Sequence, residues 1–385
     1  MVHLAKRLRD IEPFHVMDVL ARARALEAQG RSIIHMEIGE PDFPTAEPIR
    51  RAGMEALAAG RTHYAPALGL ESLRAAIATS YPPSAHVDAA RVVVTPGASG
   101  ALALALAAIL DPGDQVLLAD PGYPCNRHFV RLFEGDPVAI PVDAATDFQL
   151  TADLIRARWT PRTVAVLLST PSNPTGTLVP PAQMRAIVDT VAERGGVLIV
   201  DEIYHGLVYD AETITAATYS PDVFVVNSFS KYYGMTGWRL GWLVVPNAYV
   251  SAVEKLAQNI FIAAPTLAQY AALCALGPEV RGELERRRRV FQTRRDYLLP
   301  ALRALGFGAP VTPQGAFYIY ADCSGFSSDS HAFALDLLAR AGVAVTPGID
   351  FGLHGGERHL RFSYATAQEH LEEGVRRLAA ALAGR

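Results

Sequence analysis

The sequence has few cysteines, only 3 in 385 residues, namely Cys125, Cys274 and Cys323. They are odd in number and scattered, with no Cys-x-x-Cys spacing, so we expect neither a disulfide framework nor a zinc site. The 11 histidines likewise show no spacing typical of metal ligands. We predict that no metal is bound, and we expect a reducing, cytoplasmic location.

Long apolar segments are also missing. The longest apolar run, around 101–110, is alanine-rich and too short to span a bilayer. Charges interrupt the N-terminal MVHLAKRLRDIEPFHVMDVL where a signal peptide would need an apolar core. Positive charge is not in excess either, because the net charge is −4 at pH 7. We therefore expect a soluble protein that binds neither membranes nor nucleic acid.

One cluster of arginines departs from this balance. It consists of Arg286–Arg289, Arg294 and Arg295, inside a helix-like stretch at 283–299. Glutamates in the same stretch can pair with these arginines at helical spacing. We interpret the cluster as a solvated helix face or a subunit contact.

Short β-branched runs alternate with helical patterns from Arg91 onward, which predicts an α/β layer with a largely parallel central sheet flanked by helices. The runs are Val92–Thr95, Gln115–Ala119, Val138–Val142, Val164–Ser169, Val197–Asp201, Val223–Ser228 and Leu240–Val245. Since a chain of 385 residues exceeds the usual size of a single core, we also expect a second, smaller domain with a cleft beside it.

The smaller domain reads as α+β. Its elements are predicted at both ends of the chain, as a helix at His15–Gln29 leading into Ile33–Ile38, strands at Ala316–Ala321 and His359–Tyr364, and a helix at Ser330–Ala341. We therefore predict a large domain at 46–285 and a small domain formed by 1–45 and 286–385.

A possible phosphate site lies in VVVTPGASGALALAL, where a strand ends at Thr95 and a helix begins near Ser99. Unpaired amides at a helix N-terminus bind a phosphate dianion, and Gly97 and Ala98 are small enough to let it approach. The spacing matches neither a dinucleotide-binding nor an ATP-binding loop. An ordinary capped helix remains the alternative.

Two further strands end in polar side chains. STPSNPTG follows the strand at 164–168 and offers Asn173 as a donor, although a plain turn would look the same. GVLIVDEIYHGLVY delivers Asp201 as its strand leaves the sheet, and Tyr204 three residues later. A buried carboxylate needs a cation, and a protonated pyridine nitrogen would serve; helix capping by Asp201 is the alternative.

The most specific motif is VFVVNSFSKYYGMTGWRLGW at 223–242. It places Lys231 after a strand and a Ser-x-Ser pair, Ser228 and Ser230, with Arg239 eight positions further on. An amine beside a phosphate cradle is what an aldehyde cofactor bearing a phosphate requires. A plain surface lysine would not explain the other three motifs.

Together these segments resemble the class I/II aminotransferases of pyridoxal phosphate (PLP) fold type I, the aspartate aminotransferase superfamily, from GEPDF at residue 39 to LRFSYA at residue 360. The resemblance implies PLP bound through Lys231 as a Schiff base, with Asp201 on the pyridine nitrogen and Asn173 and Tyr204 on the 3′-oxygen. Lys231, Asp201 and Tyr204 would be catalytic. The phosphate cup would comprise Ala98, Ser99, Ser228 and Arg239, with Gly97 in the turn, and Ser230 would also bind the cofactor.

The resemblance also implies roles outside these motifs. Tyr123 in DPGYP would stack on the cofactor, and Arg361 would clamp the substrate carboxylate, with Gly39 and Asn173 beside it. Core packing for Tyr123, a structural ion pair for Arg361 and a turn for Gly39 are the alternatives. Tyr64 in HYAPALG resembles the tyrosine that reaches the neighbouring subunit's phosphate, which implies a homodimer.

The expected activity is that of a transaminase, EC 2.6.1 class, moving an amino group from an L-amino acid to 2-oxoglutarate or pyruvate through pyridoxamine phosphate. Carbon–sulfur lyases that act by β-elimination and cyclopropane-forming synthases share the cofactor chemistry. An amino-acid sensor with a DNA-binding head is a third alternative, but the chain offers no residues for that head.

Substrate choice is open from the sequence. No arginine or lysine can be assigned to a distal carboxylate from its motif alone. The segment Pro13–Met17, where the family's N-terminal segment contacts the substrate side chain, is bulky and apolar. It favours a neutral or apolar amino acid over aspartate.

Overall fold

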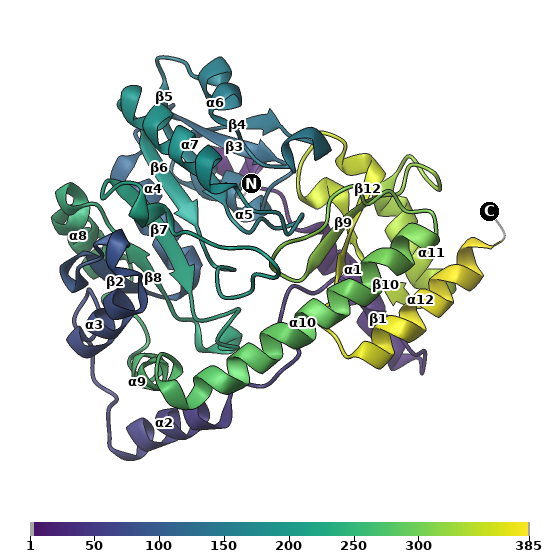
Figure 1. Cartoon of the computed structure of the whole chain (residues 1–385), viewed down its shortest axis with the longest axis horizontal. Coiled ribbons are helices and arrows are strands. Elements are labelled where there is room, and N and C mark those ends of the chain that lie inside the picture. Colours follow the sequence, from purple (N-terminus) through teal and green to yellow (C-terminus); the bar gives the residue numbers. More distant parts are fainter. Residues whose placement is uncertain (1–3, 384–385) are drawn as a thin grey trace.

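The computed structural model describes residues 4–383 and is built around a seven-stranded sheet (Figure 1). The strands run in the order β2-β8-β7-β6-β5-β3-β4, and only β8 is antiparallel to its neighbours. They are β2 (Val92–Thr95), β3 (Gln115–Asp120), β4 (Asp136–Pro141), β5 (Thr163–Ser169), β6 (Val197–Asp201), β7 (Val223–Ser228) and β8 (Gly241–Val244). The predicted α/β class with a mostly parallel sheet is confirmed.

Helices cover both faces of this sheet because its strands are apolar on both sides. Val93 and Phe224 pack with the face covered by α4 (Gly97–Ile109), α5 (Pro124–Leu132) and α8 (Val250–Ile260). Val94 and Val225 point to the opposite face. The helices there are α2 (Glu47–Ala58), α3 (Glu71–Ser80), α6 (Ala152–Arg158), α7 (Pro181–Glu193) and α9 (Thr266–Ala275). Each buried side chain of this size stabilises the layer by roughly 1.5–3 kcal/mol, which keeps the strand ends in place.

A smaller α+β part contains elements from both ends of the chain. Its antiparallel sheet has the order β11 (Thr346–Pro347), β12 (His359–Ser363), β9 (Tyr318–Asp322), and β1 (Ile34–His35) pairs in parallel with β10 (Val343–Ala344). Around them lie α1 (His15–Ala28), α11 (Ser330–Ala341) and α12 (Gln368–Leu382). The strand expected at Ile33–Ile38 pairs with β10 over only two residues, Ile34 and His35.

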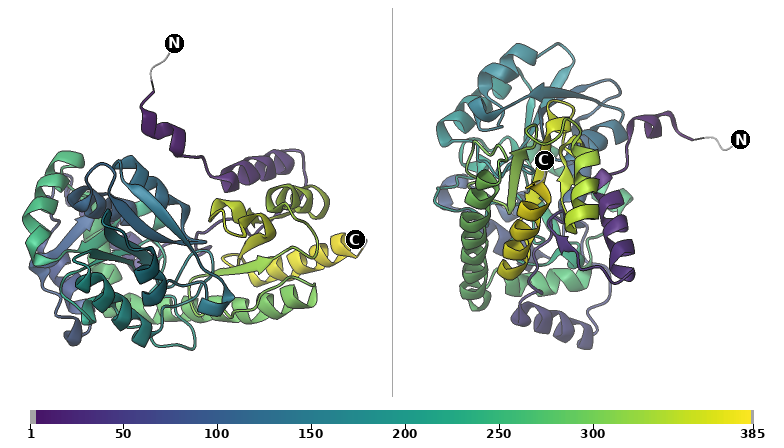
Figure 2. Two further views of the ribbon diagram at one scale, coloured as in Figure 1. Left: turned by 90° about the horizontal axis from the view of Figure 1, so that it is seen from above. Right: turned by 90° about the vertical axis from the view of Figure 1, so that its right-hand side faces the viewer.

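The long helix α10 (Pro278–Ala304) runs along both parts (Figure 1). The division that we propose, a large domain at 46–285 and a small domain from 1–45 and 286–385, has its second boundary inside this unbroken helix. Figure 2 shows the N-terminal segment with η1 (Lys6–Asp10) standing away from the body. In the part of the chain from 4 to 383, no helix is both long and apolar enough to cross a membrane.

The interpretation of the α10 arginines as a solvated face is wrong for three of them. Arg286 and Arg289 are exposed, but Arg287, Arg294 and Arg295 are buried. Arg294 donates two hydrogen bonds of 2.8 Å to the Asp42 carboxylate. Arg295 pairs with Asp210 and Asp296, and Arg287 pairs with Glu283 on α10 itself. The negative charge of these carboxylates offsets the cost of burying the three guanidinium groups.

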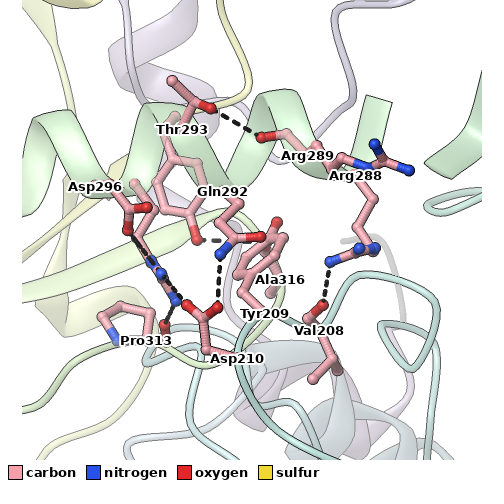
Figure 3. A network of polar contacts seen from close by, with 12 residues as sticks. Val208, Tyr209, Asp210, Arg288, Arg289, Gln292, Thr293, Asp296, Pro313 and Ala316 are labelled. Atoms are coloured by element: carbon pink, nitrogen blue, oxygen red, sulfur yellow. Dashed lines mark hydrogen bonds and ion pairs between the residues drawn. The ribbon is translucent and has the colours of Figure 1, made fainter. Parts of the chain in front are cut away.

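Two other arginines of α10 bind the loop that follows β6. Arg295 donates to Asp210 at 2.7 Å, and Arg288 donates to the main-chain oxygen of Val208 at 2.9 Å. Figure 3 shows this network, in which Gln292 also donates to Asp210 and Tyr209 donates to the main chain of Ala316. The network ties the loop after β6 to α10 and to the segment leading into β9.

Candidate active site

A cavity of about 530 Å³ opens at the carboxyl ends of the central strands, between the two parts of the protein. Ser169, Asp201 and Ser228 end the adjacent parallel strands β5, β6 and β7, which is where ligands bind in sheets of this type. The site residues expected from the sequence that line the cavity are Gly39, Ala98, Ser99, Tyr123, Asn173, Asp201, Tyr204, Ser228, Ser230, Lys231, Arg239 and Arg361. Residues up to 322 positions apart in the sequence therefore meet in one volume.

Lys231 lies in this cavity on the loop that follows β7. Its Nζ donates to the main-chain oxygen of Gly39 at 2.6 Å, which connects the loop to the N-terminal segment. Burial lowers the pKa of Lys231 to about 8; the positive charges of Arg361 and Arg239 add to this effect, and Glu40 opposes it. A lysine with such a pKa has a substantial uncharged fraction near neutral pH, so the amine can act as a nucleophile or a base.

Asp201 is buried at the end of β6 and lines the cavity. One carboxylate oxygen accepts the Ile203 N–H at 3.1 Å. A turn follows instead of a helix, so helix capping does not explain the residue. Burial raises the pKa of Asp201 to about 6, against the Ile203 hydrogen bond and the charge of Lys231. A cationic ring nitrogen entering the cavity would stabilise the ionised form.

The end of the cavity beside the N-terminus of α4 has groups that could hold a dianion. Helix α4 begins at Gly97, two residues earlier than expected, with φ of +72°. A side chain at 97 would collide with the Arg239 guanidinium, so glycine is needed both for this backbone and for the close approach. Ser228 Oγ donates to Ser230 Oγ at 2.9 Å. Hydroxyls, a guanidinium and the first amides of α4 thus surround one small volume.

Arg361 is buried on β12. It donates to Asn173 Oδ1 at 2.9 Å and to the Glu37 main-chain oxygen at 2.6 Å, whereas its Nε has no hydrogen-bond partner. Its guanidinium stacks on Tyr318, 4.3 Å from the ring centroid. Within residues 4–383 no carboxylate forms an ion pair with it, so the alternative of a structural salt bridge finds no partner. A buried, uncompensated cation favours a carboxylate from the substrate.

The N-terminal segment supplies an apolar wall. Phe14, Val16 and Met17 line the cavity as expected, and the Asp350 carboxylate fixes the start of α1 by accepting from the His15 and Val16 amides at 2.7 and 2.8 Å. The cavity is also lined by Leu20, Ile38, Phe351 and Tyr318, which were not predicted from the sequence. In the sequence they look like ordinary apolar positions of helices, strands and turns. No local pattern distinguishes them from residues of the core.

Two expected site residues lie outside this lining. Gly97 is one of them, and the Arg239 guanidinium packs against its Cα. Tyr64 is 82% exposed and does not face the cavity of its own chain. Tyr123 lines the cavity, and burial raises its pKa well above the usual value, with a further contribution from Cys125.

The sequence of the chain is similar to those of known enzymes. The family model described as aminotransferase class I and II matches residues 31–378. The chain is 41% identical over 372 residues to a valine–pyruvate aminotransferase of Mycobacterium tuberculosis, covering 96% of each, and 35% identical to an aspartate/prephenate aminotransferase of Thermus thermophilus, covering 98% of each.

Solved structures agree over the whole chain. A crystal structure of an aminotransferase from Mycobacterium tuberculosis superimposes with a TM-score of 0.96 at 40% identity, covering 100% of both chains. The aspartate aminotransferase from Thermus thermophilus with maleate gives a TM-score of 0.93 at 35% identity, covering 99% of this chain and 100% of that one.

Proposed function

Since the chain belongs to the class I and II aminotransferases, a family dependent on pyridoxal phosphate, we propose that it transfers the amino group of an apolar L-amino acid to pyruvate. Transamination between an amino acid and a 2-oxo acid is the activity of its relatives, and it is the activity of this chain. The proposal concerns the choice of donor and acceptor.

The observation that carries this choice is the cavity wall. Phe14, Val16, Met17, Leu20 and Ile38 offer an apolar surface to the substrate side chain. The cations in the described lining are Lys231, Arg239 and Arg361, and all three have other proposed partners. A second carboxylate on the substrate would therefore be buried without a cation, which costs several kcal/mol. Valine-like donors and pyruvate avoid that cost, and the name of the Mycobacterium tuberculosis relative agrees.

We assign the residues around the cofactor as follows. Lys231 would hold the aldehyde, Asp201 would keep the ring nitrogen protonated, and Asn173 and Tyr204 would bind the 3′-oxygen. The phosphate would be held by Gly97, Ala98, Ser99, Ser228, Ser230 and Arg239, and Tyr123 would stack on the ring. When bound, the cofactor supplies an electron-accepting ring that stabilises negative charge at the substrate Cα.

The protein's own groups then bind the substrate and move protons. Arg361 binds the substrate carboxylate, with Asn173 and the backbone of Gly39 beside it. Lys231, whose amine lies in the cavity, would act as the base that removes the α-proton. Because donor and acceptor are held together, this proton transfer is intramolecular, which gains several powers of ten in effective concentration.

We also propose a cytoplasmic homodimer with shared active sites. Tyr64 is largely exposed in the single chain, and it would complete the phosphate site of the partner subunit. Exposed apolar side chains lie on nearby segments and favour burial in a subunit contact; they are Met54, Leu57, Ile260 and Ile262.

A panel of amino donors tests the substrate assignment. Each amino acid is mixed with the holoenzyme without an acceptor, and the loss of the cofactor's aldehyde absorbance is followed. Valine, leucine and alanine should react faster than aspartate, and pyruvate should restore the absorbance faster than 2-oxoglutarate. A large preference for aspartate would contradict the assignment. A lyase would instead release ammonia continuously without an acceptor.

A substitution in the apolar cavity wall tests the same assignment from the side of the protein. Leu20→Arg adds a cation to the lining and should raise the aspartate-to-valine ratio of kcat/KM by about tenfold or more, as expected for one new charge pair in a partly buried site. Ala25→Arg adds the same charge to the exposed side of α1 and should leave the ratio unchanged.

A further inference from the structure

Tyr318 contacts three residues of the site, Tyr204, Arg361 and Gly39. It lies on β9 and is 1% exposed, and it lines the cavity. Its hydroxyl oxygen is 2.9 Å from the Tyr204 hydroxyl oxygen. Its ring lies under the Arg361 guanidinium at 4.3 Å, and its hydroxyl packs on Gly39 so closely that no side chain fits there.

The three contacted residues come from separate parts of the fold. Tyr204 is on the loop after β6, Gly39 is in the N-terminal segment, and Arg361 is on β12, adjacent to β9. Arg361 is paired directly with Tyr320 in the sheet, so Tyr318 is its diagonal neighbour on the same strand pair. Diagonal neighbours are within reach of long side chains, which explains how the guanidinium lies over the Tyr318 ring.

The hydrogen bond between the two tyrosines has a preferred direction in the holoenzyme. Each hydroxyl has one proton. If Tyr204 donates its proton to the cofactor 3′-oxygen, Tyr318 must be the donor within the pair. A hydroxyl that accepts a hydrogen bond becomes a stronger donor, so Tyr318 strengthens the bond that Tyr204 makes.

We propose that Tyr318 is a positioning residue that orients both Tyr204 toward the cofactor and Arg361 toward the substrate carboxylate. Its hydroxyl acts on Tyr204, and its ring face holds the guanidinium in plane by cation–π attraction. This inference rests on the proposed function, because it assumes that Tyr204 and Arg361 have the roles assigned above.

Two substitutions separate the hydroxyl from the ring. In Tyr318→Phe the ring is retained, so the weaker Tyr204 donor leaves the cofactor oxygen more basic. The pH at which the visible band of the bound cofactor changes should rise by roughly half a unit to one unit. The affinity for 3-methylbutanoate, a carboxylate without an amine, should change less than about twofold, because the stack on Arg361 remains.

Tyr318→Leu removes both the hydroxyl and the ring. It should show the same shift of the visible band and also bind 3-methylbutanoate about fivefold or more weakly, as the loss of a buried cation–π contact predicts. Both quantities are measured by absorbance on the holoenzyme, and neither is a turnover rate.

A double-mutant cycle and a matched control complete the test. In a Tyr204→Phe background, adding Tyr318→Phe should shift the band no further, since the proposed path runs through Tyr204. Tyr364→Phe removes another buried tyrosine hydroxyl, bonded to the Ala316 main chain at 3.4 Å outside the cavity lining, and should titrate as the wild type.

The proposal is overturned if Tyr318→Phe titrates as the wild type, if its shift persists in the Tyr204→Phe background, or if Tyr364→Phe shifts equally. Failure of the proposed function would look different. The wild-type protein itself would then fail to bind pyridoxal phosphate at Lys231 or to react with any amino acid.

Discussion

Arg361 and Asn173 lie 188 positions apart in the sequence, and their side chains are joined by a hydrogen bond of 2.9 Å. Arg361 belongs to the small antiparallel sheet, whereas Asn173 follows β5 of the large sheet. The bond therefore connects the proposed carboxylate clamp to the residue proposed for the cofactor 3′-oxygen. Arg361 is already oriented before substrate arrives, which lowers the entropic cost of binding.

Arg361→Lys should lower kcat/KM for the amino donor by roughly 30- to 1,000-fold, about 2–4 kcal/mol, because lysine cannot bind a carboxylate through two parallel hydrogen bonds. Most of the loss should be in KM, since the carboxylate is held equally before and during the reaction. Arg358→Lys makes the same change on an exposed side chain nearby and serves as the control. An unchanged KM in Arg361→Lys would remove the clamp from the mechanism.

The lowered pKa of Lys231 predicts how the cofactor-free protein captures pyridoxal phosphate. Only the uncharged amine attacks the aldehyde, and burial lowers the pKa of Lys231 to about 8. The rate of capture should rise about tenfold per pH unit up to about pH 8 and then level off. A rate that keeps rising toward pH 10 would indicate an ordinary lysine. Stopped-flow absorbance measures the rate, and Lys255→Ala, an exposed lysine, should behave as the wild type.

The position of the reduced label identifies the lysine itself. Borohydride treatment of the holoenzyme, followed by peptide mapping, should find the cofactor on Lys231. Lys231→Ala should bind the cofactor weakly and without a covalent bond, and it should lose transamination.

The placement of Asp201 and Lys231 in one cavity could be predicted from the sequence, because each follows a recognisable strand. Asp201 ends β6 and Lys231 closely follows β7, and the carboxyl ends of adjacent parallel strands necessarily meet. The burial of three α10 arginines could not be predicted, for the opposite reason. A helical charge pattern shows partners on the same helix, whereas Asp42, the partner of Arg294, is 252 positions away. Tyr318 was missed because a buried aromatic in a strand carries no local sign of its neighbours.

Asp201→Asn should stabilise the cofactor-free protein while impairing catalysis. Burial raises the pKa of Asp201 from 3.8 to about 6, so the carboxyl favours folding only when protonated. Its contribution is fully present below about pH 4 and is lost as the pH rises through about 6. Neutral asparagine avoids this loss, and the variant should be more stable by up to about 3 kcal/mol at pH 8, with no difference near pH 4.

Urea unfolding of both cofactor-free proteins across this pH range measures the difference. Asp189→Asn, on the exposed side of α7, controls for removing a carboxylate anywhere on the protein. Equal stability of Asp201→Asn and wild type at every pH would mean that the Asp201 carboxyl is solvated in the folded protein. In the holoenzyme the same substitution should slow transamination at least about a hundredfold, since the ring nitrogen loses its anionic partner.

Mixing two defective variants tests whether Tyr64 acts across the subunit boundary. Tyr64→Ala should reduce activity about tenfold by removing one charge-assisted hydrogen bond to the phosphate, and Lys231→Ala should be inactive. In a heterodimer of the two, one site combines an intact Lys231 with the Tyr64 of the other chain. Random reassociation makes half of the dimers mixed, so about a quarter of all sites should be complete, and activity should rise above that of either variant.

The matched control mixes Lys231→Ala with Arg361→Lys. Both of these residues are proposed to serve the site of their own chain, so every site in the mixed dimer still lacks one of them. The activity of that mixture should therefore stay at the level of the separate variants. If the Tyr64→Ala mixture also gains nothing, although the subunits are shown to have exchanged, Tyr64 does not serve the neighbouring site. If both mixtures gain activity, exchange repairs the sites by some other route. Only a gain confined to the Tyr64→Ala mixture supports a shared active site.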